Sequence, residues 1–250
     1  MRSSVCEISA DESYCAAVNP EVMLVATGYS SLVFCMGTLP GIDRQAVEQG
    51  LPTLQAPLFN ESGVIIPQIA LRDDASLGER TCRLLIDDRP VMTYPILNDD
   101  EFWMSGPFAD LAAPRFGRTW EAREHALPGL LPGGSVLKGD QAAQELWQKE
   151  GYMTARGTDY VSAALYASLK ANVAELLAEP LVEYYLNLTS AKFPVLVEAI
   201  RARFKTDDLT LGLRKRLQAS TSIKNFPIVL EQLIAEQVST TEPPAPQKPN

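Results

Sequence analysis

Few side chains in this sequence have the type and spacing that enzyme chemistry requires. His125 is the only histidine, and its charged neighbours Arg123 and Glu124 indicate an exposed loop or helix end rather than a catalytic pocket. There is no second histidine to complete a zinc site. The Gly-Gly-Ser run at 133–135 lacks the Gly-Lys-Ser/Thr ending of a phosphate-binding loop. We therefore predict that the protein is not an enzyme.

Three clusters of carboxylates are the remaining candidates for holding a metal ion: Asp73-Asp74, Asp87-Asp88 and residues 99–101. Neighbouring side chains on a strand point to opposite faces, so adjacent carboxylates do not converge on one ion. Each cluster also lies at a turn signal, where acidic side chains hydrogen-bond to the local backbone. Solvated turns are the favoured interpretation, and we predict neither a metal site nor a cofactor.

The composition is that of a globular protein. Hydrophobic residues make up 46% and charged residues 21% of the 250 residues. No apolar run approaches the roughly eighteen residues of a membrane span, and the segment 1–15 lacks the apolar core of a secretory signal. The cysteines at 6, 15, 35 and 82 fit no metal-ligand spacing and are expected to be reduced thiols. We expect a soluble protein without a membrane span.

Positive charge is concentrated in one segment, although the whole chain has a net charge of −9. Between residues 201 and 224, seven cations stand against two anions, an excess of five. The candidate interface residues there, called the basic stripe below, are Arg214, Lys215, Arg216 and Lys224. A solvated face or a contact with an acidic neighbour explains such a stripe. A helix-turn-helix is disfavoured, because the segment 226–237, which would read DNA, has two glutamates and no cation.

The second part of the chain predicts a helical domain over residues 158–237. Leu209, Leu213 and Leu217 recur every four residues and therefore share one face of a helix, which should end near residue 220. The same periodicity predicts helices over 158–177, 180–188, 193–204 and 226–236. Five consecutive amphipathic helices joined by short turns must share one core.

The first part of the chain predicts short strands and short helices. The runs at 22–27 and 32–36 suit two strands, or one strand and a turn. Further strands are expected at 64–71 and 101–104, with a hairpin formed by 82–86 and 91–97. Pro67 places the strand at 64–71 near an edge or a bulge. The prolines at 52 and 57 exclude a long helix there. Short helices are expected at 41–49 and 140–150, the latter with Ala143, Leu146 and Trp147 facing inward.

Together these elements predict an α+β fold with flexible ends. We expect a small α/β subdomain formed by 20–72 and 117–157, an inserted β-rich subdomain at 73–116, and a five-helix subdomain at 158–237. Residues 1–19 show little pattern and are expected to be a flexible lead. The segment 238–250 contains four prolines, so we expect a disordered tail.

Two stretches resemble the FHIPEP family, the export-gate proteins of flagellar and virulence type III secretion systems. The sequence SGVIIPQIALRDD at 62–74 is similar to the family's Val-Val-Pro-Pro-Ile-Arg-Ile-Arg-Asp-Asn strand. The series from GYMTARGTDY at 151 to SIKNF at 222 follows the family's helices in the same order. The resemblance covers about residues 20–236, which correspond to the first three cytoplasmic subdomains without the membrane block and the last subdomain.

The resemblance also implies a site and partners. In this family a hydrophobic dimple between the first two cytoplasmic subdomains receives chaperone–cargo complexes. The dimple's aromatic residue corresponds to Phe116, beside Arg115, whereas Ala113 and Ala163 stand where the family has an aspartate and a threonine. Secretion chaperones and export-apparatus proteins are the implied partners. A cytoplasmic location, beside the inner-membrane export apparatus, and a monomer or weak homo-oligomer are expected.

Three functions stay open at this point. The first is an export-gate module that binds chaperones or other export components. The second is a diverged regulator or scaffold that keeps the fold, and the third is a helical domain that binds nucleic acid through the basic stripe. Loss of partner binding by Phe116→Ala would support the first, and a steep salt dependence of DNA affinity would support the third.

Overall fold

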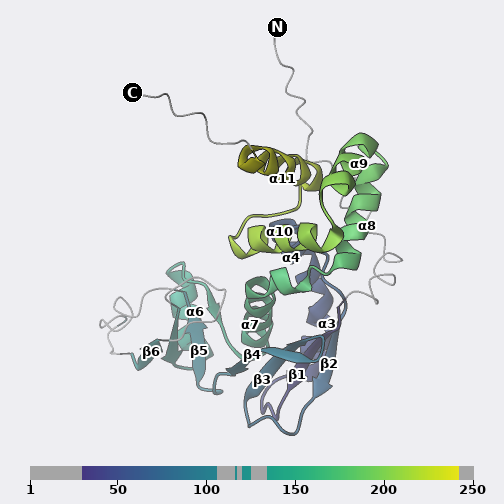
Figure 1. Cartoon of the computed structure of the whole chain (residues 1–250). Coiled ribbons are helices and arrows are strands. Elements are labelled where there is room, and N and C mark those ends of the chain that lie inside the picture. The colour runs from purple at the N-terminus through teal and green to yellow at the C-terminus, as the bar shows by residue number, and fades with distance from the viewer. Residues whose placement is uncertain (1–29, 106–115, 117–119, 125–133, 242–250) are drawn as a thin grey trace, which may run out of the picture.

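The computed structural model describes residues 30–105, 116, 120–124 and 134–241. They form two four-stranded sheets and a series of helices, which confirms the mixed helix and strand content predicted from the sequence. Figure 1 shows the second sheet to one side of α7, and helices α8 to α11 stacked beyond the first sheet. The predicted lead at 1–19 and the predicted strand at 22–27 lie outside the described residues.

The first sheet has the strand order β2-β1-β3-β4. β1 (Leu32–Met36) pairs in parallel with β2 (Ile69–Asp73) and antiparallel with β3 (Thr81–Ile86), which forms a hairpin with β4 (Arg89–Pro95). The hairpin was predicted and is confirmed. β2 begins later than the predicted 64–71 strand, because Pro67 cannot donate to a ladder and pairing starts only after it.

The second sheet has the order β6-β7-β5-β8 and antiparallel pairing. Its strands are β5 (Glu101–Met104), β6 (Ala122–Glu124), β7 (Ser135–Lys138) and β8 (Thr154–Ala155). The helix α6 (Gln141–Lys149) lies between β7 and β8 in the sequence. Side chains alternate across the sheet. Trp103, Val136 and Ala155 on one face join the main core, whereas Phe102, Met104 and Leu137 on the other face form a separate core.

The strand pairing divides the strands of the predicted 73–116 subdomain between the two sheets. The hairpin β3–β4 belongs to the same sheet as β1, so it is part of the first body of the fold. β5 instead pairs with β7 and β8. The separate unit is therefore the second sheet with α6, called the second-sheet unit below. Sequence alternation identifies strands but does not say which distant strand they pair with.

Short helices connect the strands of the first body, as the prolines required. α3 (Arg44–Gly50) begins at Asp43, whose carboxylate accepts from the Ala46 N–H at 3.2 Å. The 3-10 helix η2 (Leu51–Leu54) and α4 (Gln55–Ser62) follow. α4 ends at Gly63, which has φ of 80° and supplies the left-handed turn common after helices.

The predicted helix over 158–177 is divided at Asn172. α7 (Gly157–Ala171) ends there, and the 3-10 helix η3 (Val173–Leu176) follows. The Asn172 side chain donates to the Ser168 carbonyl oxygen at 2.8 Å, a local bond that competes with continuation of the helix. The apolar periodicity continues through both pieces because η3 remains buried against α10.

The remaining helices are α8 (Glu179–Ser190), α9 (Pro194–Arg203), α10 (Thr206–Gln218) and α11 (Phe226–Thr241). Proline lies in the first turn of α8 and α9, where its missing N–H has no intrahelical partner to lose. α11 extends beyond the predicted start of the tail at 238, because the first proline that stops it is Pro243. The rest of the predicted tail, 242–250, lies outside the described residues.

One buried core runs from the first sheet into the helices. Tyr185 of α8 joins the two parts, since its hydroxyl donates to the Gly63 carbonyl oxygen at 2.9 Å and accepts from the Ile65 N–H at 2.8 Å. The Ile223 N–H donates to the Ser62 carbonyl oxygen at 2.8 Å. Within the described part of the chain, no helix is both long and apolar enough to cross a membrane.

Candidate partner-binding site

Four aromatic side chains meet on the face of the second sheet that is turned away from the main core. The Phe116 ring centroid lies 5.2 Å from Trp147 and 6.2 Å from Trp120. Trp147 is also 5.5 Å from Trp120 and 5.3 Å from Tyr152. These contacts are edge-to-face, the geometry in which the positive ring edge meets the negative ring face. We call Phe116, Trp120, Trp147 and Tyr152 the aromatic cluster.

Phe116 is the exposed member of the aromatic cluster, and its ring packs on the two buried tryptophans. The residue exposure is 42% for Phe116, 5% for Trp120 and 0% for Trp147. α6 positions Trp147: Asp140 caps this helix by accepting from the Ala143 N–H at 2.9 Å. Ala143 and Trp147 are four residues apart and therefore face the sheet together. Phe116 thus presents an aromatic surface on a rigid base.

The backbone of Phe116 is in the left-handed region, with φ of 55°. This conformation costs a residue other than glycine about 1–2 kcal/mol. The ring contacts with the two tryptophans offset that cost. Residues held in such conformations cluster at functional sites, which makes this exposed ring a candidate contact for a partner.

The other predicted site positions lie on another element or outside the described residues. Ala163 is half-buried on α7, which contacts α3 of the first body and also β5 and β8 of the second-sheet unit. Phe116 lies on the second-sheet unit. A partner that contacts both positions must therefore reach from this unit to α7. Ala113 and Arg115 lie outside the described residues.

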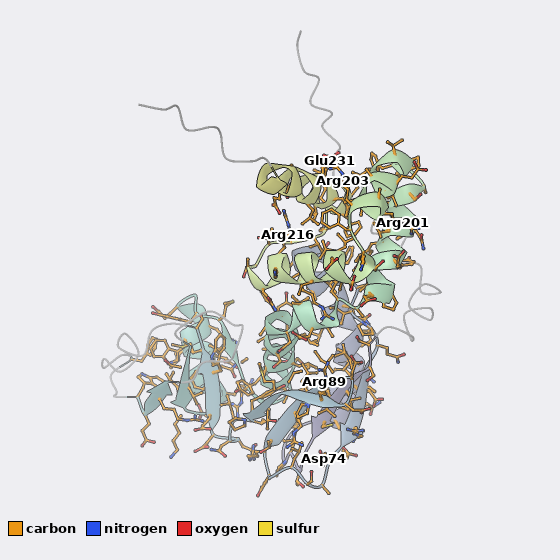
Figure 2. All side chains as sticks on the ribbon, viewed as in Figure 1. Asp74, Arg89, Arg201, Arg203, Arg216 and Glu231 are labelled. Carbon is orange, nitrogen blue, oxygen red and sulfur yellow. The ribbon has the colours of Figure 1, made fainter. Side chains whose placement is uncertain are left out.

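The basic stripe contributes largely to helix packing. Arg214 Nε donates to the Leu177 carbonyl oxygen at 2.9 Å, and Lys224 Nζ donates to Asn60 Oδ1 at 2.9 Å. Arg216 donates to Gln232 Oε1 at 2.8 Å and forms an ion pair with Glu236. Figure 2 places Arg216 where α10 faces α11. Lys215 is exposed. Three of these four cations are therefore engaged within the molecule.

The acidic clusters form turns and ion pairs. Hydrogen bonds from the Ser76 hydroxyl and N–H hold the pKa of Asp74 below its usual value. Burial raises the pKa of Glu101, but hydrogen bonds from Arg123 and Asn98 outweigh it and leave that pKa lowered. No group of three His, Cys, Asp or Glu side chains that could hold a metal ion occurs among the described residues. His125 lies outside them.

Sequence reasoning identified Phe116 from a family resemblance but missed its support. Trp147 was expected to face inward, and it does; Leu146 was also expected to, but it is 37% exposed. Trp120 and Tyr152 were not singled out. The available signal was the group of aromatic residues at 116, 120, 147 and 152. Their convergence depends on the pairing of β6, which follows Trp120, with β7, which precedes α6.

The fold and sequence can be compared with known proteins. Similar solved structures include nonameric SctV-C of EPEC (16% identity, TM-score 0.63, 85% of this chain and 61% of that one). Others are Chlamydia pneumoniae CdsV (17%, 0.66, 85% and 62%) and Shigella flexneri MxiA (15%, 0.59, 85% and 61%). These likenesses show the fold, and the chain spans about three fifths of each of these structures.

No curated protein matches the chain by sequence. The FHIPEP family model, by contrast, matches residues 9–245, nearly the whole length. The protein belongs to the FHIPEP family.

Proposed function

We propose that this protein is a non-enzymatic component of a type III secretion apparatus, located in the cytoplasm. In this proposal it is an export-gate module that binds chaperone–cargo complexes or other export components. Membership of the FHIPEP family supports the assignment to a type III secretion system. The observation that carries the binding role is the exposed Phe116, which the two tryptophans hold at the position where the resemblance implies a partner-binding aromatic residue.

The chemistry of this surface defines the kind of partner that fits. An exposed aromatic ring on a rigid base offers large apolar contact area at a low cost in side-chain entropy, as at interface hot spots. Alanine at 113 and 163 supplies no side-chain hydrogen bond, and polar groups are what usually give such sites their selectivity. We therefore propose an apolar side chain of the partner as the occupant, with selectivity supplied elsewhere on the surface.

Assembly is part of the proposal. SctV-C of EPEC is nonameric, and CdsV has been solved in a complex with CdsO. By analogy we propose export-apparatus proteins as partners and weak self-association of this chain. A diverged regulator or scaffold with the same fold is the alternative. Binding of nucleic acid loses support, because Arg214, Arg216 and Lys224 have partners within the molecule.

A titration with purified chaperone–cargo complexes of a type III system tests the proposal. Phe116→Ala should weaken binding about thirtyfold or more, which corresponds to the loss of about 2 kcal/mol that marks a hot spot. Phe193→Ala is the matched control, since Phe193 is similarly exposed at 37% but lies between α8 and α9. Phe116→Leu keeps an apolar side chain over Trp147. This variant therefore separates the loss of the aromatic contact from unfolding of the aromatic cluster. Equal affinities of Phe116→Ala and Phe193→Ala would contradict the proposed site.

A further inference from the structure

The second-sheet unit is joined to the first body by two crossing segments, 96–100 between β4 and β5, and 155–156 between the end of β8 and α7. Trp103, Val136 and Ala155 bury its apolar face in the main core, and β5 and β8 contact α7. Apolar burial is non-directional. It therefore holds the unit against α7 without defining the angle between them. Directional contacts at the crossing segments can define that angle.

Three such contacts converge on residues 97–99 of the first crossing. Arg80 Nη1 donates to the Leu97 carbonyl oxygen at 2.8 Å, and Arg80 Nη2 lies 3.0 Å from Asp99 Oδ2. Arg156 Nη2 donates to the Asp99 carbonyl oxygen at 2.7 Å. Arg80 belongs to the first body, directly before β3, and Arg156 ends the second crossing, directly before α7. Both crossings are thus tied to each other and to the first sheet at one point.

The first body holds Arg80 in a defined position. Its backbone has φ of 54°, its N–H donates to the Thr38 carbonyl oxygen at 2.9 Å, and its carbonyl oxygen accepts from the Ile96 N–H at 2.6 Å. The Arg80 side chain is only 17% exposed. A planar guanidinium fixed in this way holds two acceptors in one geometry more rigidly than a flexible ammonium group does.

The second crossing, by contrast, leads directly into Gly157, a glycine in the left-handed region at the start of α7. Its φ is 52°, and a Cβ added there would meet no described atom within 4 Å. Backbone conformation, not packing, therefore favours glycine at this position. Hinges consist of a few residues at the ends of elements that can absorb changes in backbone angles. This crossing has that form.

We propose that Arg80, Asp99 and Arg156 form an orientation lock, which fixes the angle between the second-sheet unit and α7. These are positioning residues. Only the purpose of the lock rests on the proposed function. The lock would set how Phe116 on the unit and Ala163 on α7 are presented to a partner. Loss of either arginine contact frees the unit to rotate at Gly157, where the second crossing enters α7.

Distances between spin labels test the lock in the full chain. One label is placed on α3 by Glu48→Cys and the other on α6 by Lys149→Cys, both exposed positions. Cys6→Ser and Cys15→Ser remove two other thiols, and the native Cys35 and Cys82 are buried. The distance distribution then reports the orientation of the second-sheet unit relative to the first body.

Arg80→Met keeps the apolar stem of the side chain and removes the guanidinium, and Arg156→Met does the same at the second crossing. Both should broaden or shift the distance distribution relative to the parent, and Arg80→Lys should have a smaller effect. Arg201→Met is the matched control, because Arg201 pairs with Glu183 at 2.8 Å between α8 and α9. The control should superimpose on the parent.

Unchanged distributions in both methionine variants overturn the lock, and so does an equal change in Arg201→Met. If Arg80→Met does not fold by circular dichroism, Asp99→Asn, which removes only a charge from an exposed residue, is measured in its place under the same criteria. Failure of the parent protein to bind chaperones would contradict the proposed function but would leave these distances unaffected. The two proposals therefore fail separately.

Discussion

Tyr185 shows how one side chain links two parts of the fold. Its buried hydroxyl bonds to Gly63 and Ile65 of the first body from α8. Tyr185→Phe leaves a buried N–H and a buried carbonyl oxygen without this partner, so we expect a loss of about 1–3 kcal/mol in unfolding free energy. Urea denaturation measures it. Tyr166→Phe is the control, since its hydroxyl bonds the half-exposed Glu61; an equal or larger loss there would contradict the role of Tyr185.

Glu61 predicts a small dependence of stability on pH. Hydrogen bonds from Lys170 and Tyr166 lower the pKa of this carboxyl group. A carboxyl group with a lowered folded pKa stabilises the protein above its unfolded pKa of about 4.3, and this contribution is lost as pH falls through the folded value. Glu61 and Lys170 are nearly half exposed, at 47% and 49%, so solvent screening limits the gain to under about 1 kcal/mol.

Glu61→Gln provides the comparison. At pH 7 the wild type should be slightly more stable than the variant, and the difference should close as the pH falls below about 4. Urea denaturation at a series of pH values measures both proteins. A difference that grows toward acid pH would show that the carboxylate is not stabilised in the folded state.

At the residue scale, sequence could identify Phe116 but not its surroundings. The resemblance of one short motif predicts that this ring lies at a partner site. The left-handed backbone at Phe116 was not predicted, and the contact with Trp147 joins residues that are thirty-one positions apart in the sequence. The basic stripe shows the opposite outcome: a row of cations in sequence resembles a binding face, yet Arg216 bonds to α11 across a turn.

At the scale of elements, the end of α4 approaches the backbone of the 220–225 loop closely. Gly63 has φ of 80°, and a Cβ there would lie 2.2 Å from the Lys224 backbone nitrogen. Gly63→Ala combines left-handed strain with displacement of that loop, so we expect a loss of at least about 2 kcal/mol.

Gly50→Ala is the control for this substitution. Gly50 has φ of −77°, and the nearest atom to an added Cβ is Ser162 Oγ at 3.9 Å. Alanine should be neutral or stabilise the protein by up to about 1 kcal/mol, because it restricts the unfolded chain. Thermal and urea unfolding measure both variants, and similar losses in the two would contradict the account of Gly63.

Local rules predicted the helices well and their long-range partners poorly. Pro180 and Pro194 mark the starts of α8 and α9, and leucines at every fourth residue mark α10. The predicted ends of these helices lie within two residues of the observed ends. The hairpin β3–β4 was equally clear, but its pairing with β1 was not. Pairing between distant strands depends on tertiary packing, which alternation in one segment does not report.

At the scale of the whole molecule, the second-sheet unit is the part of the fold that carries the proposed binding surface. Figure 1 shows it beside α7, and it carries the exposed Phe116. Its apolar face belongs to the main core and its aromatic cluster to a separate core. The fold thus presents the proposed binding surface on a unit that is anchored on one side and free to meet a partner on the other.

Photo-crosslinking from position 116 in the native host tests the central claim most directly. Benzoylphenylalanine replaces Phe116 in one protein and the similarly exposed Phe193 in the control. We predict that crosslinks from 116 contain a secretion chaperone, its cargo or an export-apparatus protein, identified by mass, and that crosslinks from 193 do not. Crosslinks from 116 without any of these proteins, or with the same set from both positions, would contradict the assignment of this face to type III secretion.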